Sequence, residues 1–93
     1  MTENDLSSQN FEAKRKRLLY RSWNRGMKET DLLLGQFADS HAGSFDARQL
    51  VLYEALLQES DPDILSWIAG RESPPAKHDN DVMNLLLNFK FYE

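Results

Sequence analysis

The side chains best able to do chemistry in this chain are charged groups around a single glycine, Gly26. Arg25 precedes Gly26 and Glu29 follows it, and residues 13–28 carry seven Lys or Arg residues and no acid. The whole chain has a net charge of −4, so the remaining residues, with 4 bases and 15 acids, carry −11. Such a separation of charge can steer an oppositely charged partner toward the basic segment.

No arrangement typical of an active site or a metal site is present. The chain has no cysteine, and its two histidines, His41 and His78, stand in no spacing known for nucleophiles or metal ligands. The four glycines are scattered singly, which excludes a glycine-rich phosphate loop. Helix capping explains the paired acids Asp61 and Asp63. We therefore expect neither an enzyme nor a metal site, with His41 partly buried near a helix end and His78 exposed.

The basic run Lys14–Arg17 leaves three interpretations open. Each residue turns a helix by about 100°, so four consecutive bases cannot all face one phosphate track, and some must lay their alkyl stems along the buried side. A solvated helix face is the favoured interpretation, and recognition of an acidic protein surface comes next. Nucleic-acid binding comes last, because the chain is acidic overall.

The elements that must position these residues are helices, because apolar residues recur at helical spacing and no segment alternates with period two. Helix starts and stops predict five of them: residues 10–24 capped by Asn10, 27–41, 46–59 opened by a capping box of Asp46 and Gln49, 61–69 capped by Asp61 and stopped by Gly70, and a last helix capped by residue 79 or 80. The sequence thus predicts an all-α, compact five-helix bundle in a single domain, with residues 1–9 as a frayed N-terminal segment and residues 10–93 as the helical domain.

Two features near the basic segment have more than one explanation. Gly26 stands where a helix often ends in a left-handed residue, and the next helix is expected to bury a stripe that includes Leu32 and Leu34. Trp23, three residues before Gly26, either covers the core or stands exposed as an interface anchor, and the residues favour neither.

The chain carries no recognisable membrane or targeting segment. No stretch approaches the roughly 20 apolar residues of a membrane span. The first twelve residues hold three acids and no base, the reverse of a targeting sequence. We expect a cytoplasmic protein of a bacterium, or one of the mitochondrial matrix if a transit peptide has been removed.

Residues 25–29 read Arg-Gly-Met-Lys-Glu, between Leu18-Leu19-Tyr20 and Asp31-Leu32-Leu33-Leu34. Further along stand Gln49-Leu50-x-x-Tyr53, Asp61-Pro62-Asp63 with Trp67, and Asp81-Val82-Met83. Together these segments resemble the succinate dehydrogenase flavinylation factors, a family of assembly factors whose signature is Arg-Gly-x-x-Glu. The resemblance covers about residues 13–91. Thr30, where the family often has a larger residue, is a mild departure.

The resemblance implies a small five-helix assembly factor rather than an enzyme. Such factors bind the flavoprotein subunit of succinate dehydrogenase, in some bacteria that of fumarate reductase, and promote covalent attachment of FAD to a histidine of that client. FAD is then the client's group, and the factor holds no cofactor tightly. We expect a monomer that neither inserts into membranes nor binds nucleic acid. The alternative is a small helical regulatory or nucleic-acid-interacting protein that uses its basic first helix.

The resemblance also assigns a partner-binding site. Its centre is Arg25, Gly26 and Glu29, and we expect the neighbouring residues to contribute: Arg21, Trp23, Met27, Lys28 and Asp31. In this hypothesis Arg25 presents its planar fork to a carboxylate of the partner, so that its removal costs little stability. Gly26 bares its backbone for close approach, and Glu29 either orients Arg25 or accepts a hydrogen bond from the partner.

Overall fold

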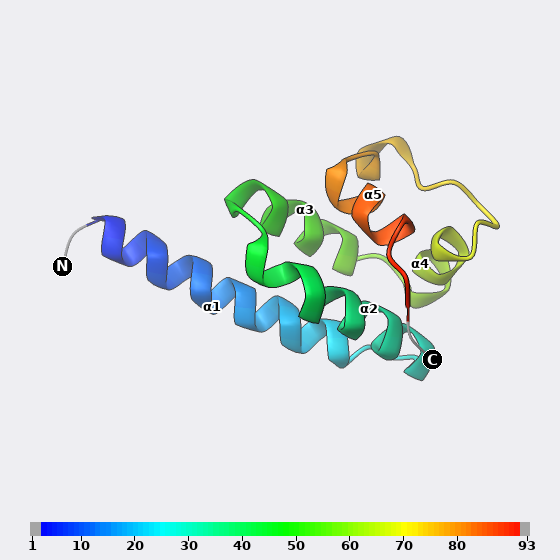
Figure 1. Cartoon of the computed structure of the whole chain (residues 1–93), viewed down its shortest axis with the longest axis horizontal. Coiled ribbons are helices and arrows are strands. Elements are labelled where there is room, and N and C mark those ends of the chain that lie inside the picture. Colours follow the sequence, from blue (N-terminus) through cyan, green and yellow to red (C-terminus); the bar gives the residue numbers. More distant parts are fainter. Residues whose placement is uncertain (1–2, 92–93) are drawn as a thin grey trace.

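The chain folds into five α-helices and two short 3-10 turns, described in a computed structural model for residues 3–91, with side chains described from Phe11 onward. The helices are α1 (Glu3–Trp23), α2 (Lys28–His41), α3 (Ala47–Leu57), α4 (Asp61–Ile68) and α5 (Asp81–Leu87), and the turns are η1 (Ala42–Ser44) and η2 (Ala76–His78). Helix α2 returns along α1, α3 also packs against α1, and α5 lies against α3 and α4 (Figure 1). The predicted all-α bundle is confirmed for the described residues. None of the helices described is long and apolar enough to cross a membrane.

Helix α1 begins at Glu3, seven residues before the predicted start. Asn10 therefore lies inside the helix, and the prediction that it caps α1 is wrong. Residues 3–10 contain neither glycine nor proline, so nothing in them breaks the helical backbone. Residues 1 and 2 of the segment expected to fray lie outside the described part of the chain. The N-terminal part of α1 extends beyond the other helices (Figure 1).

Side chains fix the ends of several helices as predicted. The carboxylate of Asp46 accepts a hydrogen bond from the backbone N of Gln49 (2.8 Å), and the Gln49 side chain accepts one from the backbone N of Asp46 (3.0 Å), which completes the capping box of α3. Asn80 caps α5 by accepting from the backbone N of Met83 at 3.0 Å. Gly70 follows α4 with φ of 76°, a left-handed conformation that costs glycine little.

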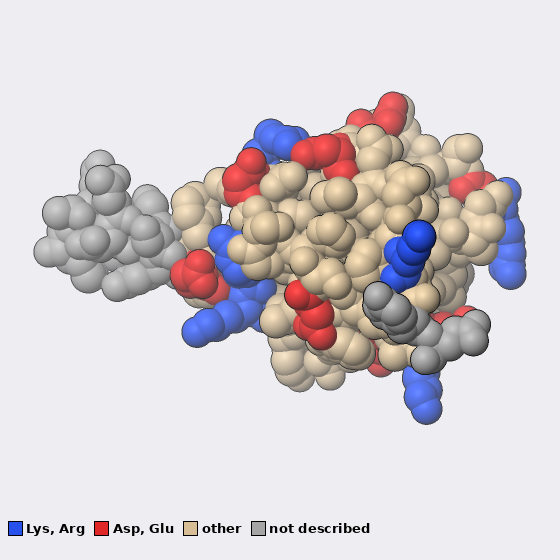
Figure 2. Space-filling model, viewed as in Figure 1, with Lys and Arg blue, Asp and Glu red and all other residues tan. Residues whose placement is uncertain are grey.

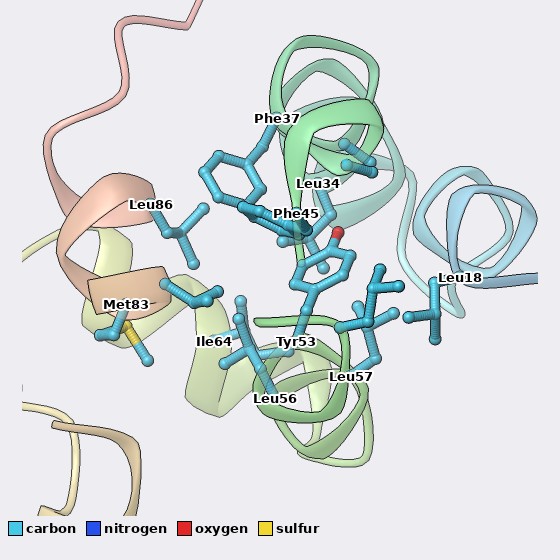
Figure 3. Close-up of a cluster of buried hydrophobic side chains, with 14 of the residues drawn as sticks. Leu18, Leu34, Phe37, Phe45, Tyr53, Leu56, Leu57, Ile64, Met83 and Leu86 are labelled. Carbon is cyan, nitrogen blue, oxygen red and sulfur yellow. The ribbon is translucent and has the colours of Figure 1, made fainter. Parts of the chain in front are cut away.

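The core gathers around the rings of Phe37 and Tyr53, whose centroids are 5.7 Å apart (Figure 3). Both side chains are fully buried, and leucines from α1, α2 and α3 surround them. The predicted stripe on α2 is wrong at Leu32, which is 47% exposed, whereas Leu34 is buried. Each residue turns a helix by about 100°, so the side chains of Leu32 and Leu34 point about 200° apart and cannot both face the core.

A buried pair of hydroxyls ties α1 to α3. The Ser22 hydroxyl donates to the carbonyl of Leu18 at 2.7 Å, so the Tyr53 hydroxyl donates to Ser22 Oγ at 2.5 Å. Burial raises the pKa of Tyr53 to about 12. The neutral phenol is therefore the form that the fold accommodates.

This pKa shift predicts a specific loss of stability in alkali. The unfolded chain releases the Tyr53 proton near the ordinary tyrosine pKa of 10.0, whereas the folded chain holds it to about 12. Between pH 10 and 12 the free energy of unfolding should therefore fall by up to about 3 kcal/mol through this group. Urea unfolding of Tyr53→Phe should show a shallower fall over the same range, after a loss of about 1 kcal/mol at neutral pH. Tyr20→Phe, at a side chain 68% exposed, is the control and should keep the full slope.

Candidate partner-binding site

The turn between α1 and α2 is held by hydrogen bonds to two carboxylates. The backbone N of Arg25 donates to Asp31 Oδ1, and the backbone N of Met27 donates to Asp61 Oδ2 at 2.8 Å. Asp31 belongs to α2, but Asp61 stands at the start of α4, far along the chain. The turn is thus fixed from both sides, and Asp31, which we expected to face a partner, serves the turn itself.

The Arg25 side chain is directed inward rather than toward a partner. Its Nε donates to Asp61 Oδ1 at 2.8 Å, Nη1 to the carbonyl of Leu57 at 2.7 Å, and Nη2 to the carbonyl of Glu59 at 2.8 Å. Both members of the Arg25–Asp61 pair are only 10% exposed in their side chains. The planar fork therefore satisfies carbonyls at the end of α3 as well as an internal carboxylate. The expectation that it meets a carboxylate of the partner is corrected by these contacts.

Asp61 is occupied by this same interaction and does not cap α4. The cap is Ser60, whose hydroxyl accepts a hydrogen bond from the backbone N of Asp63 at 3.2 Å. Asp61 takes the first position of the helix, before Pro62, and its two oxygens bind Arg25 and the α1–α2 turn. We call the pair Arg25 and Asp61, with the carbonyls and backbone N that they bind, the turn clamp. It joins the α1–α2 turn to the α3–α4 turn.

Gly26 is the exposed point of the clamped turn. Its φ is not positive, since Gly70 is the one described glycine with that conformation, so the prediction of a left-handed Gly26 is wrong. A Cβ at Gly26 would lie 3.4 Å from Asp61 Oδ2, an ordinary contact. The fold itself therefore does not require glycine here. Gly26 borders a hollow of about 350 Å³, lined also by Arg21, Asn24, Arg25, Glu59, Ser60 and Asp61.

Glu29 is exposed in the first turn of α2. Its side chain makes no hydrogen bond or ion pair with any described residue, and Asp61, not Glu29, orients Arg25. Of the two roles expected for Glu29, the internal one is therefore wrong. The carboxylate stands free at the positive end of a helix, where it is stabilised without an internal partner. Lys28 beside it is also exposed, and Met27 is 37% exposed.

Trp23 combines the two alternatives left open for it. A Cβ added to Gly35 would overlap the Trp23 ring, so the indole lies directly against the α2 backbone. Its Nε1 donates to Asp39 Oδ1 at 3.1 Å. The side chain nevertheless remains 38% exposed. Trp23 thus covers α2 with one face and offers the other to solvent.

Half of the basic run is used within the chain. Arg15 Nη1 donates to the carbonyls of Ala42 (2.5 Å) and Phe45 (2.9 Å), and Lys14 pairs with Glu54 at 3.0 Å. Lys16 and Arg17 are exposed and make no ion pair within the described residues. Basic side chains lie over α1 next to the grey residues in Figure 2. The expectation that some of the run flanks the buried side is confirmed.

Neither histidine belongs to this surface. His41 is half-buried in the last turn of α2, as predicted, but His78 is only 3% exposed, so its prediction is wrong. The η2 turn folds the linker back, which places His78 Nε2 2.6 Å from Glu59 Oε2 and its ring against Trp67. The hydrogen bond from His78, with a second from Lys77, lowers the pKa of Glu59. No group of three metal-ligating side chains is found in the part of the chain described.

One buried hydroxyl beside the turn has no partner. Thr30 is fully buried in α2, and its Oγ1 makes no hydrogen bond in the described structure. Thr30→Val keeps the shape and removes the unpaired polar group, so it should raise the free energy of unfolding by about 1 kcal/mol. Tm should rise by roughly 4–8 °C in a thermal melt. Thr30→Ser, which keeps the hydroxyl and loses a methyl group, is the control and should lower Tm. A Thr30→Val variant no more stable than the parent would contradict the assignment.

Comparison with known proteins matches this chain to one family. The family model described as flavinator of succinate dehydrogenase matches residues 16–90. Among similar curated proteins, succinate dehydrogenase assembly factor 2, mitochondrial, from Dictyostelium discoideum is 42% identical over 83 residues, which cover 89% of this chain and 57% of the relative. The protein of the same name from Culex quinquefasciatus is 46% identical over 72 residues, covering 75% of this chain and 45% of the relative.

The chain spans about half the length of the curated relatives that it matches. The matched segment nevertheless includes the whole α1–α2 turn, α2, α3, α4 and α5. The chain therefore belongs to the family of flavinators of succinate dehydrogenase.

Proposed function

We propose that this chain is a non-enzymatic assembly factor that binds the flavoprotein subunit of succinate dehydrogenase and promotes covalent attachment of FAD to it. The proposal rests on the α1–α2 turn of this family member, which the turn clamp holds in place. Gly26 and Glu29 stand exposed on a turn that Asp61 and Asp31 hold in place. A rigid turn loses little conformational freedom on binding, which favours a tight complex.

The proposed role of each motif residue depends on whether its polar groups already make hydrogen bonds within the chain. Arg25 and Asp61 are occupied with each other, so they position the turn and do not contact the client through their charged ends. Gly26 permits close approach of the client to the turn backbone, and Glu29 accepts a hydrogen bond from the client. Trp23 and Met27 supply apolar contact beside it, and their partly exposed side chains suit an interface anchor.

We propose that the factor acts by selecting one arrangement of the client. A protein that binds can shift a partner only toward the arrangement that it binds more tightly. The arrangement required here brings the flavin next to the histidine that it modifies. The bond formation then belongs to flavin and client, and the factor meets FAD only as part of the client. The same interaction with fumarate reductase is a further proposal.

The factor is proposed to work as a monomer in the compartment where the client subunit acquires its flavin. That compartment is the cytoplasm in a bacterium and the mitochondrial matrix in a eukaryote; the relatives compared above carry the word mitochondrial in their names. Neither nucleic acid nor a membrane is needed for this role.

The proposal is tested by counting covalent flavin. The client subunit is produced in cells that lack the factor, with and without this chain, then denatured, and its fluorescence from bound flavin is measured. We expect much more flavin per subunit when the chain is present, together with a purified complex of the two proteins. Equal amounts of covalent flavin per subunit with and without this chain, together with no complex on gel filtration, would contradict the proposal.

A further inference from the structure

A second surface of exposed side chains lies along α1, on a different face from the turn clamp. Lys16, Leu19, Tyr20 and Trp23 follow the spacing of three, four and seven residues that places side chains on one helix face. Tyr20 is 68% exposed, and Lys16 is exposed with no intrachain partner among the described residues. Of the four, Leu19 is half-buried against the core, whereas Lys16 and Tyr20 are left to solvent.

Helix α2 continues the same surface. Lys28, Leu32, Gly35 and Asp39 lie four, seven and eleven residues apart, again on one helix face. Trp23 lies directly against Gly35 and bonds Asp39, so it joins this face to that of α1. Leu32 is 47% exposed. We call the eight residues of the two faces the α1–α2 seam.

The seam is hollowed where α1 passes η1. A groove of about 260 Å³ opens there, with apolar walls from Leu19, Ala38 and Ala42. Lys16 and Asp39 border the same groove, so it is continuous with the seam. At the end away from the groove, the seam reaches Trp23, the last residue of α1 before the α1–α2 turn. An extended apolar strip thus begins beside the turn and ends in a groove, with a lysine toward each end.

We propose that the α1–α2 seam binds an acidic amphipathic segment of the flavoprotein subunit; this inference rests on the proposed function. An amphipathic helix lays its apolar side into an apolar groove, and here Tyr20 and Leu32 would meet that side. Lys16 and Lys28, which no acid of this chain neutralises among the described residues, would meet acidic residues that flank it. The turn and the seam then form one continuous docking surface of larger area.

Charge also favours an acidic segment of the client over a second copy of this chain or nucleic acid. A second copy of the chain, packed seam to seam around a two-fold axis and antiparallel, would bring Lys16 opposite Lys28 and place like charges together. Nucleic acid would need a track of basic side chains, whereas the two lysines of the seam are separated by apolar side chains. An acidic apolar segment of the client meets neither obstacle.

The first test uses variants outside the motif, so that it is independent of the turn. Tyr20→Ala combined with Leu32→Ala should weaken binding to the flavoprotein subunit about tenfold, chiefly through faster dissociation. Both side chains are exposed, so circular dichroism and Tm should stay close to those of the parent. Val51→Ala combined with Leu87→Ala is the matched control, since these apolar side chains on α3 and α5 are 55% and 40% exposed. The control should bind like the parent.

The second test concerns charge. Lys16→Glu should slow association with the subunit roughly tenfold at low salt, and the difference should shrink as salt rises. Lys90→Glu, at another exposed lysine, is the control and should associate with the subunit at the parental rate. Association of Lys16→Glu at the parental rate at low salt would overturn the charge argument and with it the proposed occupant.

A crosslink identifies what lies on the seam. The chain has no cysteine, so Tyr20→Cys carries a unique thiol for a photoreactive label. In a mixture with the flavoprotein subunit, the label should capture an acidic segment of the subunit, and the same label at Val51→Cys should capture none. Capture of a second copy of the chain, or of a basic segment, overturns the proposal.

The outcomes separate the seam from the proposed function. If the parent binds the subunit and the seam variants bind equally well while Gly26→Arg does not, the seam proposal is wrong and the function stands. If the parent itself binds no flavoprotein subunit, both fail together.

Discussion

Replacing Gly26 with arginine is expected to leave the helical fold intact and to abolish the complex with the flavoprotein subunit. Gly26 is exposed without a positive φ, and a Cβ there meets nothing closer than Asp61 Oδ2 at 3.4 Å. The new side chain therefore projects from the turn into the space that the partner must enter. Affinity should fall at least about 100-fold, equal to roughly 2.7 kcal/mol, and covalent flavin on the client should fall with it.

The matched control for Gly26→Arg is Ala55→Arg, which adds the same side chain at an exposed position of α3. Both variants should keep the parental circular dichroism spectrum, and Tm should change by only a few degrees. Calorimetric titration with the subunit should separate them, with Ala55→Arg binding as the parent does. An unfolded Gly26→Arg would show that glycine serves the fold and not the interface.

Removing Arg25 is expected to cost the largest amount of stability of any substitution in the motif. Arg25→Ala leaves the largely buried carboxylate of Asp61 without its charge partner and deprives two carbonyls at the end of α3 of their donors. Breaking such a pair costs about 3 kcal/mol, which corresponds to a fall in Tm of roughly 12–24 °C for a domain of this size. The structure thus reverses the sequence-based expectation that this substitution costs little stability.

A double-mutant cycle tests the clamp directly. Asp61→Ala should lower Tm by a similar amount, and the double variant should cost clearly less than the two single losses together, because each single variant already breaks the pair. Arg48→Ala breaks the exposed pair that lowers the pKa of Asp81 to about 2, and it should change Tm far less. Additive effects at Arg25 and Asp61 would contradict the clamp.

Local signals in the sequence were sufficient to predict most of the helices. Asp46 and Gln49 form the capping box that their spacing indicates, and Gly70 ends α4, because such contacts join residues only three or four positions apart. The start of α1 could not be predicted in this way. Asn10 resembles a cap, but a cap-like residue does not by itself stop a helix when no glycine or proline stands before it.

The chemistry of the site depended on contacts that no local pattern predicts. Arg25 and Asp61 are 36 residues apart, and the capping position predicted for Asp61 gave no sign of its partner. His78 similarly became buried because a linker folded back onto Trp67. The residues of the motif could be named from the sequence, but not which of them face solvent. Glu29 and Gly26 do, whereas Arg25 does not.

The position of Trp23 gives the protein a built-in optical probe of its own docking surface. Of its two tryptophans, Trp67 is 7% exposed within the core, whereas Trp23 is 38% exposed beside the turn. A partner that covers the turn or the seam would exclude water from the indole of Trp23 and leave Trp67 unchanged. The emission spectrum of tryptophan overlaps the absorption spectrum of flavins. A flavin brought near this surface would therefore quench the fluorescence of Trp23 by energy transfer. Arrival of the client and arrival of its flavin can thus be timed separately, without adding any dye.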